Sequence, residues 1–259
     1  LEDDRCRANG SGTYLQMNGA VYLLTNEHVA VKMLNNGVAH LPRRNDRYRR
    51  LVEPMAILGF PLDLGVARIE SASWNGATQL SLPIDRFDET YCPVDAEILF
   101  VCGYPGYARP AIAEGEIRYP RETLFGVLSS PSVPILTYPV LEASRFPSCC
   151  DPFLHAAVNY EGLAHRPAEE SRETPDPRGF SGSLLWDTKF IANNSDEWTP
   201  SMAKVCGLIQ RWNPEHAVLI ATKVECVRGA LLSALRHEAA YFNWITRGRP
   251  LWQDLIDWL

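Results

Sequence analysis

The chain has 259 residues, a formal net charge of −6 and 46% hydrophobic residues. That apolar share, with 22% charged residues and seven Trp, indicates a folded protein with a large core rather than a disordered chain. The negative net charge argues against non-specific binding to nucleic acid. No apolar run approaches the roughly eighteen residues that span a membrane, and the acidic first residues lack a signal-peptide core. We therefore expect no membrane and no nucleic-acid partner.

The seven cysteines are Cys6, Cys92, Cys102, Cys149, Cys150, Cys206 and Cys226. Their number is odd, and no CxxC pair suggests zinc or redox chemistry, so we expect no metal and no cofactor. Several lie in apolar, strand-like runs, where a free thiol packs as a small hydrophobe. This cysteine pattern favours a reducing, cytoplasmic setting.

Taken in order, the chain reads as many short strands separated by turn residues. Residues 12–30 predict a strand, a turn at Asn18-Gly19 and a second strand at 21–25, because Asn-Gly between apolar alternations is a strong hairpin signal. A third apolar segment, 29–34, ends at another turn. Further strands are expected at 51–58, 64–70, 97–103, 112–118, 123–129, 134–141, 153–160, 183–187, 203–212 and 217–224. This number of strands favours two six-stranded antiparallel β-barrels over a single barrel.

Two segments depart from the strand pattern. Residues 145–178 contain the Cys149-Cys150 pair and an acidic, Pro-containing run at 167–177, which is typical of a loop. Residues 225–245 carry apolar side chains at helical spacing, and residues 251–259 predict a second short helix. We expect one domain over 1–259, with barrels at 8–110 and 111–224 and a helical segment at 225–259.

Three candidate chemical groups occur in chain order. His28 follows an apolar strand, Asp63 precedes another, and Ser181 lies in a glycine turn, residues 179–183 (GFSGS), before an apolar run. Taken singly, each has an ordinary explanation as a core histidine, a turn aspartate or a Gly/Ser turn. Asp46 and Asp85 are weaker candidates for the acid, because neither leads directly into an apolar strand. The α/β-hydrolase elbow G-x-S-x-G does not fit, because residue 183 is serine and the triad order differs.

At these residues the chain resembles the trypsin-like serine proteases, which have the chymotrypsin fold, and especially their disulfide-free bacterial branch that includes HtrA. Four motifs carry the resemblance: GSGT at 10–13, TNEHV at 25–29, DLGVA at 63–67 and GFSGS at 179–183. Weaker matches are VCGYPG at 101–106, like the turn that ends the first barrel, and GLI at 207–209, like the substrate-pairing strand. The similarity spans residues 10–237.

The resemblance implies a serine endopeptidase with no cofactor and a protein or peptide substrate. Ser181 would be the nucleophile, His28 its base, and Asp63 the group that orients the imidazole. The N–H groups of Gly179 and Ser181 would form the oxyanion hole. By analogy with the family, we expect regulated intracellular proteolysis under a protein partner, such as a bacterial stress or phage-defence pathway. The alternative is a protease-fold binding module whose triad is at rest.

Two residues depart from the family pattern. Phe180 stands where pancreatic-type members carry an aspartate that pairs with a newly cut N-terminus, so activation through that ion pair is not expected. Glu27 replaces a small residue before the histidine. If residues 27 and 28 continued the strand, alternation would turn the Glu27 side chain away from His28.

The resemblance also suggests a specificity pocket, formed by residues just before the nucleophile and by the strand after Gly207. The positions are Asp176, Arg178, Gln210, Arg211, Trp212 and Leu219. Trp212 and Leu219 would narrow the pocket, which favours a small or apolar residue before the cut bond over Lys or Arg. Two further features each have an ordinary and a functional explanation. The arginine cluster within 43–50 is either a solvated hairpin or a docking site for an acidic protein or for the chain's own acidic loop, 169–176. The apolar stripe within 252–259 either packs on the second barrel or binds a partner.

Overall fold

The structure is a computed structural model that describes residues 10–34, 39–40, 49–51, 55–75, 80–103, 133–160, 177, 179–193 and 195–246. Several predicted features lie outside these residues. They are the strands at 112–118 and 123–129, the helix at 251–259, the acidic run before Pro177, most of the arginine cluster, and the pocket candidates Asp176 and Arg178.

The first sheet has the strand order β5-β6-β2-β1-β7. Its strands are β1 (Thr13–Met17), β2 (Ala20–Thr25), β5 (Met55–Leu58), β6 (Leu64–Ile69) and β7 (Leu82–Pro83). Neighbours pair antiparallel except β1 and β7, which are parallel. The predicted hairpin turn is confirmed: Asn18 and Gly19 both have positive φ, 50° and 75°, as a two-residue turn between twisted strands requires. A short pair, β3 (Ala39–His40) and β4 (Arg49–Arg50), lies apart.

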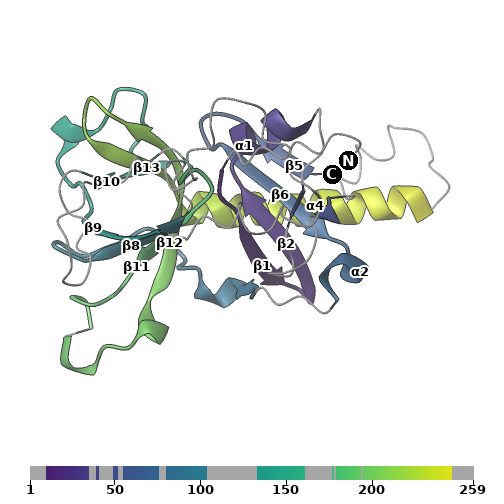
Figure 1. Cartoon of the computed structure of the whole chain (residues 1–259), viewed down its shortest axis with the longest axis horizontal. Coiled ribbons are helices and arrows are strands. Elements are labelled where there is room, and N and C mark those ends of the chain that lie inside the picture. Colours follow the sequence, from purple (N-terminus) through teal and green to yellow (C-terminus); the bar gives the residue numbers. More distant parts are fainter. Residues whose placement is uncertain are drawn as a thin grey trace, which may run out of the picture.

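The second sheet is antiparallel throughout, with the order β10-β13-β12-β11-β8-β9. Its strands are β8 (Leu99–Gly103), β9 (Val133–Thr137), β10 (His155–Asn159), β11 (Leu184–Asp187), β12 (Lys204–Asn213) and β13 (Val218–Lys223). Figure 1 shows the two sheets side by side, with the long helix α4 (Val224–Thr246) starting beside the second sheet and running along the first. The predicted class, all-β with two strand units and a C-terminal helix, is confirmed.

Two details differ from the sequence expectation. Strand β8 pairs with β9 and β11, so it opens the second sheet, whereas a division at 110/111 assigned it to the first. An apolar strand does not reveal which sheet it joins when its partners lie far along the chain. The segment at 29–34 belongs to a helix, α1 (Glu27–Leu34), with acidic Glu27 in its first turn. The strand alternation invoked for Glu27 therefore does not apply.

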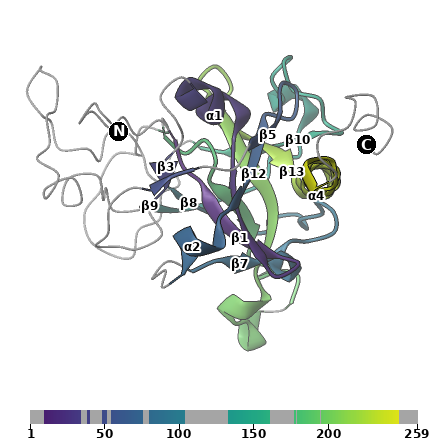
Figure 2. The ribbon, with the colours of Figure 1, turned by 90° about the vertical axis from the view of Figure 1, so that its right-hand side faces the viewer.

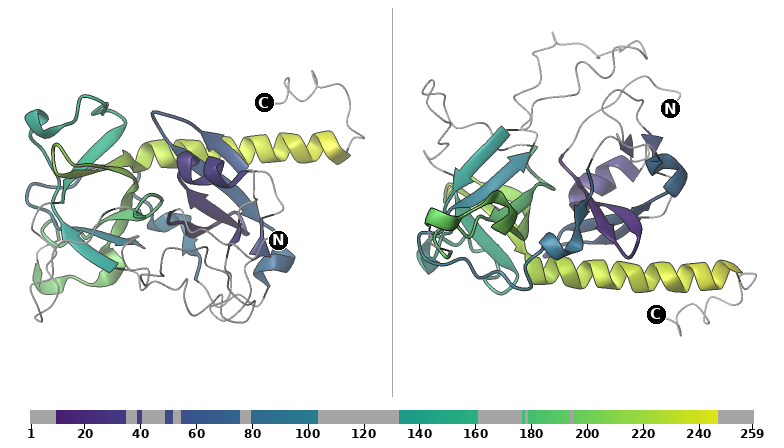
Figure 3. Two further views of the ribbon diagram at one scale, coloured as in Figure 1. Left: turned by 45° about the horizontal axis from the view of Figure 1, so that its top comes forward. Right: turned by 90° about the horizontal axis from the view of Figure 1, so that it is seen from below.

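The other short helical elements connect the strands. They are α2 (Ser71–Trp74), η1 (Ile84–Arg86), η3 (Ala143–Arg145), η4 (Ser195–Glu197) and η5 (Pro200–Met202). Among the described residues, α4 is the longest helix, and it is seen end-on in Figure 2 and along its length in Figure 3.

One hydrophobic core joins both sheets to α4. It includes Leu15 and Leu24 from the first sheet, Leu208 from the second, and Val227 and Leu231 from the helix. These side chains are at most 1% exposed, so their burial stabilises the fold by about 2 kcal/mol each before entropy is counted. The two sheets are thereby held as one body by the predicted apolar face of the helix.

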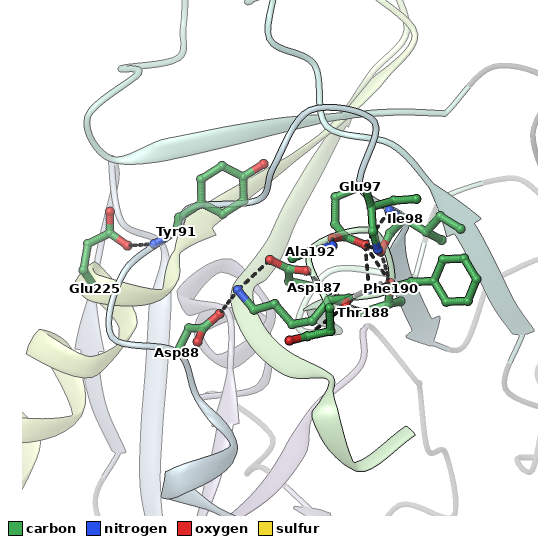
Figure 4. Close-up of polar contacts among 12 residues, drawn as sticks. Asp88, Tyr91, Glu97, Ile98, Asp187, Thr188, Phe190, Ala192 and Glu225 are labelled. Atoms are coloured by element: carbon green, nitrogen blue, oxygen red, sulfur yellow. Dashed lines mark hydrogen bonds and ion pairs between the residues drawn. The ribbon is translucent and has the colours of Figure 1, made fainter. Parts of the chain in front are cut away.

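A second set of contacts ties the segment between the sheets to the loop after β11 (Figure 4). Glu97 is fully buried, and its carboxylate accepts hydrogen bonds from four backbone N–H groups: Ile98, Phe190, Ile191 and Ala192. The Lys189 ammonium lies 2.8 Å from Asp88 and 2.9 Å from buried Asp187. Tyr91 N–H donates to Glu225 of α4. We call this set of contacts, made by Asp88, Tyr91, Glu97, Asp187, Lys189 and Glu225, the Glu97 network. It holds the segment that precedes the second sheet in place.

Candidate active site

His28 and Asp63 meet at the edge of the first sheet. His28 lies in the first turn of α1, directly after β2, and Asp63 directly precedes β6, which pairs with β2. His28 Nδ1 lies 2.7 Å from Asp63 Oδ2, and the His28 backbone N–H donates to Oδ1 at 2.9 Å. Because a carboxylate only accepts, Nδ1 carries the proton of the neutral imidazole, and Nε2 is left as an acceptor. The His28 side chain is 36% exposed.

The backbone around Asp63 is a tight turn in an uncommon conformation. Asp63 has φ of 51°, and the N–H groups of Leu62 and Asp63 both donate to Gly59 O. Asn26, fully buried at the end of β2, donates from Nδ2 to Asp63 O at 2.8 Å. Within this turn, the two hydrogen bonds with His28 hold the Asp63 carboxylate toward the imidazole.

Three buried side chains of the second sheet hold the same turn from the other side. Gln210 Nε2 donates to the carbonyls of Pro61 and Leu62, at 2.6 and 3.1 Å. Thr222 Oγ1 donates to Leu62 O at 2.7 Å, and His155 Nε2 donates to Pro61 O at 2.8 Å. Nothing in the sequence marks His155 or Thr222 for this contact, because every residue has a backbone carbonyl and none identifies its partner.

The turn that carries Ser181 is shaped by two glycines. Gly179 has φ of 103°, and Phe180 N–H donates to Pro177 O across it. Gly182 has φ of 88°, and a Cβ there would lie 2.0 Å from Ser11 O. Ser11 in turn donates from its N–H to Ser181 O and from Oγ to Gly179 O, both at 2.7 Å. Only glycine fits such a close approach.

These contacts bring the Ser181 turn against the segment around His28. A Cβ on Gly10 would lie 2.6 Å from the Val29 side chain and 3.1 Å from Ser181 O. The Gly10 backbone is therefore in close contact with both the His28 segment and the Ser181 turn. Thr25 Oγ1 donates to Ser11 O at 2.8 Å. The segments at 10–13, 25–29, 63–67 and 179–183, which carry the four sequence motifs, therefore gather at one place.

The Ser181 hydroxyl points to a backbone carbonyl. Its Oγ donates to Gln210 O at 2.9 Å, and within the described residues no hydrogen bond joins it to His28. The N–H groups of Gly179 and Ser181, the predicted oxyanion donors, make no hydrogen bond to another described residue. The site thus contains an oriented imidazole, a hydroxyl and two backbone N–H groups that have no acceptor among the described residues.

Phe180, between Gly179 and Ser181, is fully buried. Its ring packs edge-on against Tyr160, with centroids 6.5 Å apart, and it fills the space beside Gly103 of β8. A hydrophobic anchor therefore occupies the position where the resemblance placed an aspartate in other members of the family.

The predicted pocket residues of the second sheet have different environments. Gln210 and Leu219 are each 1% exposed, and Leu219 belongs to the core of the second sheet. Leu219 was expected to narrow the pocket together with Trp212, and that role stays a prediction, as does the pocket role of Gln210, whose side chain is directed into the fold. The reason for Gln210 is a β-bulge: Ile209 pairs with Ala221 and Arg211 with Ile220, which leaves Gln210 as an extra residue. Trp212 packs on Tyr160, and Arg211 is half-buried.

Other site types find no support in the described residues. Those residues hold no group of three His, Cys, Asp or Glu side chains arranged to bind a metal ion. None of their helices is both long and apolar enough to cross a membrane. The six cysteines they include are free thiols, and Cys206 is buried as expected from its apolar surroundings.

No family model and no curated protein sequence matches the chain. Solved structures do match, all at low identity. The serine protease domain of the Sesbania mosaic virus polyprotein is 12% identical, with a TM-score of 0.44, over 83% of this chain and 81% of that one. A serine endoprotease from Yersinia pestis is 12% identical, with a TM-score of 0.46, over 90% and 64%. An inactivated protease paralogue of the scabies mite is 10% identical, with a TM-score of 0.47, over 88% and 95%.

Proposed function

We propose that this chain is a serine endopeptidase in which His28, Asp63 and Ser181 form the catalytic triad. The observation that carries the proposal is the His28–Asp63 pair, whose geometry fixes the imidazole with Nε2 free to accept a proton. Ser181, in a glycine turn packed beside that pair, supplies the nucleophile. Ordinary surface histidines do not have both a carboxylate partner and an adjacent serine turn.

The reaction would begin with rotation of Ser181 about its Cα–Cβ bond, which moves Oγ from Gln210 O to His28 Nε2. His28 then takes the hydroxyl proton while Oγ attacks the peptide carbonyl. The oxyanion that forms accepts hydrogen bonds from the N–H groups of Gly179 and Ser181. Each such donor contributes about 3 kcal/mol in related sites. His28 passes the proton to the leaving amine, and water then hydrolyses the acyl-enzyme by the same steps.

A peptide substrate would bind along β12. Residues 211–213 of this strand pair with β13 on one side, and no described strand pairs with them on the side of Ser181. An extended peptide can add to such an edge through backbone hydrogen bonds. Those bonds do not depend on side chains, which suits an enzyme that cuts a polypeptide chain.

The second candidate function is a binding module with a resting triad, and the Ser181–Gln210 hydrogen bond favours it. A fluorophosphonate probe distinguishes the two. An active enzyme is labelled, and labelling is lost in Ser181→Ala but kept in Ser201→Ala, an exposed serine elsewhere. If the wild-type protein is not labelled and cuts no denatured protein, the binding module is the better explanation.

The biological setting is a further part of the proposal. Free thiols suit a reducing compartment, so we propose a cytoplasmic enzyme. A Ser181 hydroxyl that is bonded to Gln210 O instead of His28 suits an enzyme that a protein partner or the substrate itself switches on, as regulated proteolysis in a stress or phage-defence pathway would need. Labelling that rises several-fold on adding a peptide substrate would support this switch, and a constant rate would argue against it.

A further inference from the structure

Arg211 is a cation that lies on an exposed aromatic ring. It follows the bulge residue Gln210 in β12, and its guanidinium carbon lies 5.5 Å from the centroid of the Phe60 ring. The Phe60 ring is 69% exposed. Arg211 Nη2 also donates to Cys149 O, at 3.3 Å. Ring and carbonyl together hold the guanidinium in one orientation, as stacked arginines prefer.

No negative charge of the described residues neutralises this guanidinium. The carboxylate ion pairs found there join His28 to Asp63, and Lys189 to Asp88 and Asp187. The neighbouring Cys150 thiol stays protonated near neutral pH, because burial and Cys149 raise its pKa to about 11 despite the lowering effect of Arg211. Arg211 Nε is buried without a hydrogen-bond partner, although a guanidinium has five N–H donors.

The position of Arg211 is next to the reacting groups. The carbonyl that accepts the Ser181 hydroxyl belongs to Gln210, the preceding residue. The ring under the guanidinium belongs to Phe60, three residues before Asp63 and in the turn that Gln210, Thr222 and His155 hold. An extended peptide added along residues 211–213 would pass this guanidinium within a few residues of the bond to be cut.

We propose that Arg211 is a specificity-determining residue that binds an acidic side chain of the substrate, with Phe60 as the platform for its methylene groups. The inference rests on the proposed protease function and names its substrate class: peptides with Asp or Glu near the cut bond. A planar fork of N–H donors fits a carboxylate through two parallel hydrogen bonds. A partly buried cation without an acid partner among the described residues gains from an acid in the ligand.

The test compares cleavage of a peptide library by wild-type enzyme and by Arg211→Gln and Arg211→Glu. Matched peptides that differ only as Glu against Gln give the ratio of kcat/KM at each position. We expect wild type to prefer Glu at one position by about tenfold, the usual scale of a charge-assisted hydrogen bond. Arg211→Gln loses the preference, and Arg211→Glu reverses it toward Lys or Arg. Arg86→Gln, an arginine that also lies on an aromatic ring, Trp186, keeps it.

Two results would overturn the inference: a wild-type enzyme indifferent to Glu and Gln at every position, or a preference that survives in Arg211→Gln. Labelling by an uncharged fluorophosphonate reports on the catalytic groups and needs no acidic side chain. A labelled enzyme without acid preference therefore refutes the role of Arg211 alone, whereas an enzyme with neither labelling nor cleavage refutes the protease function as well. Labelling and thermal melting of both Arg211 variants show whether they are folded.

Discussion

The Glu97 network and the candidate active site both contain acids that accept several hydrogen bonds. They differ in whether polar groups remain without a hydrogen-bond partner. Glu97 is fully buried, and its donors, together with the Lys189 pairs, come from within the fold. At the candidate site, His28 Nε2, the N–H groups of Gly179 and Ser181, and most donors of Arg211 have no partner among the described residues. The contrast separates polar groups that stabilise the fold from groups available to a ligand.

The largest effect on the active-site side of this comparison is expected from Asp63→Asn. The amide would no longer fix the imidazole tautomer, so the cleavage rate should fall by about 10⁴-fold. Because His28 is partly exposed, the melting temperature should change little. Steady-state cleavage and thermal unfolding of the same sample measure both. A large loss of stability would instead place Asp63 with the structural acids.

Glu97→Ala should show the opposite pattern. Removal of the buried carboxylate takes away the acceptor that four backbone N–H groups and the Thr188 hydroxyl share, and we expect the free energy of unfolding to fall by about 3 kcal/mol. Denaturant unfolding measures the loss, with exposed Glu142→Ala as the control variant. Fluorophosphonate labelling per folded molecule should stay near the wild-type rate, and a selective loss of labelling would contradict the structural assignment.

Alkaline pH should lower the stability of the fold through titratable groups in and beside the Glu97 network. Burial raises the pKa of the Cys206 thiol and of Tyr91, and for Lys189 the hydrogen bonds to Asp187 and Asp88 raise the pKa against the opposing effect of burial. Groups with a raised pKa in the folded state retain protons that the unfolded chain loses, so stability falls as pH rises.

The loss should begin near pH 8.5, about the pKa of an unfolded cysteine, and steepen above pH 10, where Tyr and Lys titrate. Each group contributes a slope of about 1.4 kcal/mol per pH unit between its unfolded and folded pKa values. Urea unfolding from pH 7 to 10 measures the slope. Cys206→Ala should lower the slope between pH 8.5 and 10 by the share of one thiol, because the pKa values of Cys150 and Cys226 are raised as well. An unchanged slope would exclude Cys206 as a source.

Thr222→Val should have the smallest effect, and it probes the link between the two sheets. The substitution removes the hydroxyl that donates to Leu62 O, which keeps the Gln210 bond. We expect a loss of about 1 kcal/mol in unfolding free energy and a several-fold lower kcat with little change in KM. Thr222→Ser, which restores the hydroxyl, should recover kcat. A fall in stability with kcat unchanged would make Thr222 purely structural.

The elements that sequence patterns predict well are those specified by local chemistry. The Asn18-Gly19 hairpin follows from the turn residues, and α4 follows from apolar spacing. The meeting of His28 with Asp63 was expected from the family resemblance of their motifs, and the two side chains lie together where β2 pairs with β6.

The features that sequence analysis missed depend on contacts between distant residues. His155 and Thr222 reach carbonyls 94 and 160 residues away, and every residue has a carbonyl, so no residue type marks the partner. The burial of the Gln210 side chain against the Asp63 turn was not predicted, because the sequence does not show that one extra residue interrupts β12 there. The direction of the Ser181 hydroxyl likewise depends on that strand rather than on the glycine motif.

The bulge at Gln210 makes the site sensitive to the length of β12 as well as to its composition. Without the extra residue, Ile209 would be followed directly by Arg211, opposite Ala221 and Ile220, and the strand could pair regularly with β13. The amide that holds the Asp63 turn and the carbonyl that accepts Ser181 would be lost together. A deletion of one codon would therefore silence the proposed enzyme in a single step, so a one-residue gap at this position should separate active from inactive homologues.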